Sequence, residues 1–123
     1  MNVPENLLYT KDHEWISIKN SIATIGITDY AQGELGDIIF IEFPSIDEQF
    51  KTEDVFGTAE AVKTVADLFS PIDGKIIKVN SDLEDNPELV NNDPYGKGWL
   101  VKMEISNNDT SKLLTNKEYI KII

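Results

Sequence analysis

The sequence predicts a mainly β fold, a flattened antiparallel sandwich or barrel with short helices and a C-terminal helix. Short runs rich in β-branched and aromatic residues recur along the chain, and turn signals from 7 glycines and 5 prolines separate them. The length of 123 residues, with 41% hydrophobic and 27% charged residues, suits one globular unit with a substantial core. No linker or low-complexity tract interrupts the chain, so we expect residues 1–123 to form a single domain.

Seven runs are predicted as strands because apolar, β-branched or aromatic residues dominate them and turn residues bound them. In chain order they are residues 15–18, 22–27, 37–43, 55–61, 64–69, 75–79 and 99–105. In the last run every second residue from Trp99 onward is apolar, and we expect these side chains to face the core. The polar and acidic stretch 45–54 is predicted to be a surface connection.

Helix signals occur at three places. Residues 28–35 have Thr28 as a credible N-cap, and Gly36 suits the exit from the helix. Residues 86–90 read as one helical turn with a proline at its first position. The tail, about 109–123, is predicted to be helical, because Thr115–Glu118 has the pattern of a capping box ahead of an apolar run.

The charge balance excludes several classes of function. The chain has 22 acidic residues against 11 lysines, with no arginine and no cysteine, and its formal net charge is −11. Such a field repels nucleic acid and anionic membranes, and no apolar run is long enough to span a bilayer. Without cysteine, and with His13 as the one histidine, we expect no disulfide, no thiol nucleophile and no metal site. Any redox chemistry would have to reside on a cofactor.

Lys63 is the first candidate for a functional residue. It separates two predicted strands, with Glu60 three residues before it and Asp67 four residues after it. If the strands pair as a hairpin over about 55–70, the lysine amine stands at the exposed tip, free for an enzyme to acylate. Taken alone, the residue is better explained as an ordinary solvated turn lysine, because lysines are mostly exposed and mostly passive.

The stretch around Lys63 resembles the lipoylation hairpin of the glycine cleavage system H-protein family. The matching segments are Glu60–Asp67 and Ser70–Gly74. The resemblance continues, in the same order and spacing, over roughly residues 7 to 120. The further matching segments are Tyr9–Trp15, Ile25–Gln32, Leu35–Ile38, Leu89–Asn91, Asp93–Gly96 and Gly98–Leu100.

This resemblance implies a carrier of the lipoyl/biotinyl-carrier (hammerhead) fold and not an enzyme. It implies lipoic acid in amide linkage on Lys63, with Glu60, Val62 and Asp67 as the recognition motif. It also implies three partner enzymes: the glycine decarboxylase (P protein), the aminomethyltransferase (T protein) and dihydrolipoyl dehydrogenase (L protein). The carrier would take the aminomethyl group from the first to the second and electrons to the third. A lipoate–protein ligase or lipoyl transferase would attach the cofactor.

The resemblance further implies a cleft that shelters the cationic aminomethylated arm. Its matching residues are Glu14 and Asp67, with Asp12 where the family has a hydroxyl, and we expect His13 to line the cleft or to be structural. Carboxylates around an ammonium give charge-assisted bonds that are stronger than neutral ones. The chain departs from the family's usual residues in five places. Serine is usual at Asp12, Ala61 and Ala66, and smaller residues are usual at Thr64 and Val65.

The residues themselves leave other interpretations open. The chain could be an H-like protein that mainly donates lipoyl groups to other proteins, or an adaptor that is not lipoylated. A lipoyl domain of a 2-oxo acid dehydrogenase is less consistent with the length, and Val62 and Thr64 stand where biotin carriers usually have methionine. A small acidic enzyme would need His13 paired with a carboxylate, and no nucleophile stands out.

Three remaining predictions concern aromatic residues, assembly and location. We expect Trp15 and Trp99 to lie in the core, and Tyr95 to be exposed where it can contact a partner. We expect a monomer. The residues before Lys11 have no basic region followed by an apolar one, so we expect no signal or transit peptide. The location is then the bacterial cytoplasm, or the mitochondrial matrix if the sequence is a mature form.

Overall fold

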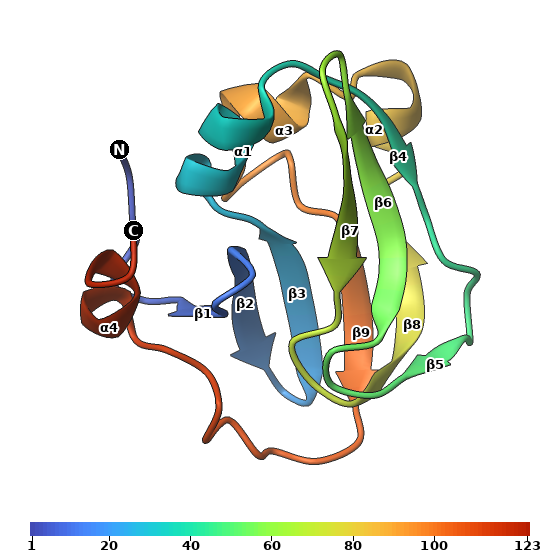
Figure 1. Cartoon of the computed structure of the whole chain (residues 1–123). Coiled ribbons are helices and arrows are strands. Elements are labelled where there is room, and N and C mark those ends of the chain that lie inside the picture. Colours follow the sequence, from blue (N-terminus) through green and yellow to red (C-terminus); the bar gives the residue numbers. More distant parts are fainter.

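Two antiparallel sheets form the framework of the fold, and the computed structural model describes residues 1–123 (Figure 1). The larger sheet has the strand order β1-β2-β3-β9-β8-β5, and the smaller sheet has the order β4-β6-β7. The strands are β1 (Leu8–Tyr9), β2 (Glu14–Lys19), β3 (Ile22–Ile27), β4 (Ile38–Glu42), β5 (Gln49–Phe50), β6 (Val55–Ala61), β7 (Val65–Phe69), β8 (Gly74–Val79) and β9 (Val101–Ile105). The helices are α1 (Asp29–Leu35), α2 (Asp82–Asp85), α3 (Leu89–Asn92) and α4 (Asn116–Ile120). The prediction of a mainly β fold with short helices is confirmed.

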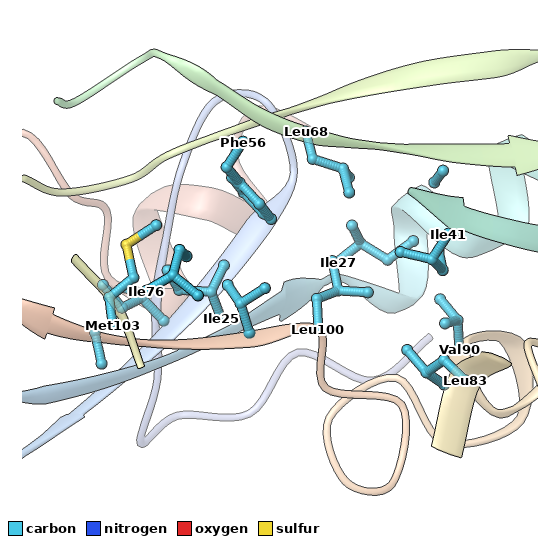
Figure 2. Packing of buried hydrophobic residues seen from close by; sticks show 14 of the residues in the cluster. Ile25, Ile27, Ile41, Phe56, Leu68, Ile76, Leu83, Val90, Leu100 and Met103 are labelled. Carbon is cyan, nitrogen blue, oxygen red and sulfur yellow. The ribbon is translucent and has the colours of Figure 1, made fainter. Parts of the chain in front are cut away.

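The main hydrophobic core lies between the two sheets. Phe56 and Leu68 come from the small sheet, and they face Ile25, Ile76 and Met103 of the large sheet (Figure 2). Each of these five side chains is at most 3% exposed. Alternation along the strands selects them, because every second residue of a strand points to the same face of its sheet. Burial of each large apolar side chain is worth about 1.5 to 3 kcal/mol.

A second, smaller cluster joins the two ends of the chain to the large sheet. It consists of Tyr9, Trp15 and Tyr119, from β1, β2 and α4. The rings of Tyr9 and Tyr119 are stacked, with centroids 4.8 Å apart and an interplanar angle of 8°. Trp15 is 3% exposed, so the prediction that it is a core residue is confirmed. This cluster fastens α4 beside the start of β2, where several of the predicted site residues lie (Figure 1).

Most of the elements that are encoded by neighbouring residues are present where the sequence predicts them. All seven predicted strands are present, and α1 begins after Thr28, whose hydroxyl accepts a hydrogen bond from the Ala31 N–H. Strands β1 and β5 were not predicted, because each has only two residues and is too short to show an alternating pattern. The helical turn predicted over 86–90 is displaced. Asn86 ends α2, its N–H donating to the carbonyl of Asp82, and α3 starts at Leu89. None of the helices has the length and apolar character needed to cross a bilayer.

Trp99 is half-buried; it packs against the second cluster and is not a member of the main core, contrary to the prediction. The alternation breaks just before β9, because Leu100 and Val101 are both fully buried and the Leu100 N–H donates to the carbonyl of Ile25. The indole is left on the surface side, where the amines of Lys78 and Lys102 lie 5.9 and 5.3 Å from its ring centroid. These distances allow cation–π interactions, so the ring contacts two lysine amines at the surface.

Tyr95 was expected to be exposed, and this prediction is wrong. Its side chain is half-buried, and its ring lies 6.1 Å from that of Trp15. Its hydroxyl accepts a hydrogen bond from the N–H of Asp29 and donates one to the carbonyl of Asn2. The ring therefore ties the N-terminal residues to the start of α1 and is not a free docking surface.

The C-terminal helix is shorter than the predicted segment 109–123. Its capping box is present: the Thr115 hydroxyl accepts from the Glu118 N–H, and the Glu118 carboxylate accepts from the Thr115 N–H. The residues before it are not helical, because the Asp109 carboxylate accepts from both the N–H and the hydroxyl of Ser111. Such side-chain bonds compete with helix formation. The stretch from 106 to 115 instead crosses from β9 to α4 (Figure 1).

Candidate functional site

Strands β6 and β7 form a tight hairpin with Val62 and Lys63 at its tip. Glu60 pairs with Val65 across the strands, and beyond this pair the Ala61 N–H donates to the Thr64 carbonyl at 2.8 Å. Both tip residues are exposed. The hairpin stands at one end of the molecule, next to α1 and α3 (Figure 1). The chain therefore presents Lys63 on a rigid, narrow support.

The tip is anchored to the loop that follows α1. The Val62 N–H donates to the carbonyl of Asp37 at 3.1 Å. Asn91 of α3 holds that loop through two side-chain hydrogen bonds. Its side-chain oxygen accepts from the Ile38 N–H at 2.9 Å, and its amide nitrogen donates to the Gly36 carbonyl at 2.8 Å. No local pattern in the sequence points to this role of Asn91, because its hydrogen-bond partners are more than fifty residues away in the chain.

The side chain of Lys63 lies against the C-terminal end of α1. A Cβ atom added to Gly36 would be 3.5 Å from Cε and 3.9 Å from Nζ of the lysine. Gly36 has a φ of 79°, a left-handed conformation that glycine adopts without strain. The end of a helix carries partial negative charge on its free carbonyls, which suits a neighbouring ammonium group.

A cleft of about 310 Å³ begins beside this point and runs between α1 and β7. Its walls come from the loop entering β2, from β3, from α1 and from β7. The lining residues are Asp12, His13, Glu14, Ile27, Tyr30, Ala31, Glu34, Leu35, Ala66, Asp67 and Leu68. Because Leu35 directly precedes Gly36, the Lys63 side chain and the cleft are neighbours. The structure thus brings Asp12, His13, Glu14 and Asp67 together, whereas Glu60 and Val62 lie outside the cleft.

Glu14 is the buried acid of the cleft, with 2% of its surface exposed. Its carboxyl accepts a hydrogen bond from the Thr10 hydroxyl at 2.7 Å and a longer one from the Phe69 N–H at 3.3 Å. Burial raises the pKa of Glu14 from its ordinary value of 4.5 to about 8; the two hydrogen bonds lower it, and the charge of Asp12 raises it further. Glu14 is therefore mostly protonated at neutral pH in the free protein, which the sequence could not indicate.

The imidazole of His13 is held by a chain of hydrogen bonds. The buried Thr28 hydroxyl accepts from the Ala31 N–H and shares a hydrogen bond with the Tyr119 hydroxyl at 2.7 Å. The same tyrosine hydroxyl shares a hydrogen bond with Nδ1 of His13 at 2.8 Å. Burial lowers the pKa of His13, against the raising effects of the Asp12 and Glu34 charges, and so favours the neutral imidazole.

The cleft therefore suits a cationic group. Four acidic side chains line it, and none of its lining residues is a lysine or an arginine. Burial favours the neutral form of the histidine on its wall. Nothing in this arrangement resembles a catalytic triad, since Nδ1 of the imidazole is hydrogen-bonded to a tyrosine hydroxyl and not to a serine or a carboxylate. Binding of a positively charged group is the chemistry that these side chains support.

Comparison with known proteins identifies the family. The model of the family described as Glycine cleavage H-protein matches residues 7–123. The chain belongs to this family. The glycine cleavage system H proteins of two strains of Staphylococcus epidermidis are 52% and 51% identical to it over 124 aligned residues, covering 100% of this chain and 98% of each relative. A crystal structure of a glycine cleavage system H protein from Mycobacterium marinum superposes with a TM-score of 0.91 at 36% identity and covers 97% of both chains.

Membership in the H-protein family settles the class of the chain. It is a carrier component of the glycine cleavage system and not a catalyst, and the lipoyl-carrier role follows from the family. Membership in the system also implies the P, T and L proteins as partners. The predicted fold class agrees with that of the solved H protein. The site roles of Thr10, Asn91 and Tyr119 were not predicted from the sequence; Asn91 and Tyr119 act through contacts with distant segments, whereas Thr10 acts on Glu14 four residues along the chain.

Proposed function

We propose that Lys63 carries lipoic acid in amide linkage and that the lipoylated chain serves glycine cleavage. The arm would receive the aminomethyl group at the glycine decarboxylase, deliver it to the aminomethyltransferase and return electrons through dihydrolipoyl dehydrogenase. One observation carries the proposal: the exposed amine of Lys63, on a rigid hairpin tip, lies beside a cleft that contains a buried acid. The dithiolane of the cofactor supplies the sulfur chemistry that the twenty amino acids of this chain lack.

The residues of the cleft fit such a group. Its walls mix apolar side chains for the arm with acids for a cationic end, and the anchor point adjoins its start at Leu35. In the proposal Asp12, Glu14 and Asp67 surround the cationic amine and hold the loaded arm. A cation beside Glu14 lowers the pKa of that carboxyl, so Glu14 would release its proton and pair with the ammonium. His13 forms part of the wall without adding positive charge.

We assign Glu60, Val62 and Asp67 to recognition of the hairpin by the enzyme that attaches the cofactor, a lipoate–protein ligase or lipoyl transferase. Val62 is 73% exposed at the tip, Glu60 is half-buried on the outer face of the small sheet, and Asp67 is exposed at its edge. We also propose that residues 1–123 act as one carrier unit and as a monomer. The charge of −11 supports the monomer, because it makes copies of the chain repel one another. The bacterial source of the curated relatives supports a cytoplasmic location.

The test is the intact mass of the chain after incubation with lipoate, ATP and a lipoate–protein ligase. A single lipoyl adduct is expected on the wild type and on Lys19→Arg, which changes another exposed lysine, and no adduct is expected on Lys63→Arg. An unmodified wild type, under conditions that modify another H protein, would favour the adaptor that is not lipoylated. Transfer of the lipoyl group from Lys63 to other proteins, without exchange of the glycine carboxyl by the decarboxylase, would favour the lipoyl donor.

A further inference from the structure

The outer face of the small sheet carries exposed apolar side chains next to Lys63. Phe40 is 54% exposed, Val65 is 60% exposed, and Ile39 is 50% exposed at a bulge in β4. Val62, at the hairpin tip, continues this group. The solvent face of an antiparallel sheet is ordinarily polar, and a cluster of exposed apolar side chains marks an interaction surface. We call these four residues the outer patch.

The register of the strands places two residues of the outer patch, Phe40 and Val65, in one row. Phe40 of β4 pairs with Glu60 of β6, and Glu60 pairs with Val65 of β7. Neighbouring strands are about 4.8 Å apart, so the two apolar side chains flank Glu60 across about 10 Å. Lys63 lies two residues beyond Val65, at the same end of the sheet. Any protein surface that receives the lysine amine must therefore pass close over this row.

The charges on this face are all negative. Glu60 stands inside the row, and the next row, Glu42–Thr58–Asp67, has a carboxylate at each end. Neither row contains a lysine. A complementary partner surface must therefore offer apolar groups at its centre and basic groups around them.

Among the enzymes that would act on the carrier, the one that attaches lipoate has the strictest need for this surface. It must bring Nζ of Lys63 itself into its active site, whereas enzymes that act on the dithiolane reach it at the far end of a long, flexible arm. In the attachment step the acyl–phosphate bond of a lipoyl adenylate breaks as the amide bond to Nζ forms, AMP leaves and the proton of the amine passes to solvent. The hairpin that carries the amine, and the face of the sheet next to it, must therefore lie in the interface with this enzyme.

We propose that the outer patch is the docking surface for the lipoate-attaching enzyme, which meets it with an apolar surface rimmed by basic residues. This inference rests on the proposed lipoylation of Lys63. A hollow between β4 and α2, lined by Phe40, Phe43 and Leu83 among others, extends the apolar surface away from the tip. Phe40 therefore lies between the hairpin and this hollow and is the central contact of the patch.

The experiment measures the rate of lipoylation by intact mass, with ligase, lipoate and ATP, for Phe40→Ser and for Ile46→Ser. Ile46 is 51% exposed and lies in the connection before β5, so it matches Phe40 in exposure but not in place. Loss of a central apolar contact should lower kcat/KM for Phe40→Ser about tenfold, mainly through KM, and leave Ile46→Ser unchanged. Circular dichroism and urea midpoints establish that both variants are folded.

A second measurement separates docking from the chemistry of the amine. Lys63→Ala cannot be lipoylated, and it should compete with the wild-type chain for the ligase, whereas the double variant Lys63→Ala/Phe40→Ser should compete about tenfold less well. Modification of Phe40→Ser at the wild-type rate, or equal competition by the two lysine variants, would overturn the docking proposal. A wild type that acquires no lipoyl group at all would instead overturn the proposed function on which it rests.

Discussion

Replacement of Glu14 by glutamine should change how stability depends on pH. The pKa of Glu14 is about 8 in the folded chain, against an ordinary 4.5 when the carboxyl is exposed on unfolding. Between these values the folded state binds the proton and the unfolded state releases it, so the free energy of unfolding falls as pH rises. At 1.36 kcal/mol per pKa unit, Glu14 alone should remove about 3 kcal/mol between pH 5 and pH 8.

The glutamine side chain keeps the shape of Glu14 and does not titrate. Its carbonyl can still accept from the Thr10 hydroxyl, but its amide nitrogen cannot accept from the Phe69 N–H, a loss of about 1 kcal/mol. Glu14→Gln should therefore be slightly less stable than the wild type at pH 5 and about 2 kcal/mol more stable at pH 8.

The measurement is urea unfolding of both chains at pH 5, 6.5 and 8, with the m-value checked for constancy. Glu104→Gln is the matched control, because Glu104 is exposed on β9 and no interior environment surrounds it. We expect the control to follow the wild-type pH profile. Stability curves of Glu14→Gln and wild type that run parallel from pH 5 to pH 8 would refute the burial argument.

Four further variants test the packing around the site and in the elements that carry it. Tyr119→Phe removes the hydroxyl that is hydrogen-bonded to both the buried Thr28 hydroxyl and Nδ1 of His13, and it should cost about 1 to 3 kcal/mol in urea unfolding; an unchanged midpoint would show that these hydrogen bonds are not needed. Gly57→Ala forces a Cβ against a backbone carbonyl of β4 and should cost about 1 to 3 kcal/mol. Gly33→Ala, on α1 with open space around it, should stabilise the chain by up to about 1 kcal/mol, and equal effects of the two glycine variants would contradict this. Asn91→Ala should speed amide hydrogen exchange at the hairpin tip, and protection equal to that of the wild type would show that the tip is rigid without it.

The parts of the fold that the sequence predicts are those decided by neighbouring residues. Thr28 caps α1 through the N–H three residues on, and the capping box of α4 spans four residues. The β6–β7 hairpin is likewise formed by neighbouring residues, so the exposed position of Lys63 follows from two short strands with a short connection. Periodicity and capping are rules about local geometry, and they succeed where no distant segment intervenes.

The predictions that failed depend on distant segments. Tyr95 is half-buried because its hydroxyl is held by Asn2 and Asp29, and Trp99 leaves the core because Leu100 is hydrogen-bonded to β3. The protonation of Glu14 and His13 in the cleft also depends on distant segments. The buried Tyr119 comes from the last helix, and the burial of Glu14 comes from segments spread over the whole chain. No pattern in a single stretch of sequence encodes such contacts.

The protonated Glu14 and the neutral His13 bear on how the proposed cleft would select its ligand. A permanently ionised, buried carboxylate would weaken the fold, and a charged imidazole would repel a cationic amine. A carboxyl that keeps its proton until a cation binds avoids the cost of burying an unpaired negative charge. When the ammonium group binds, it takes the place of the proton, so the net charge of the cleft stays constant. Binding of the amine would thus release a proton at neutral pH, and the neutral arm would leave Glu14 protonated. The same burial that gives the free chain its expected pH-dependent stability would therefore make the cleft favour the charged form of the arm over the uncharged one.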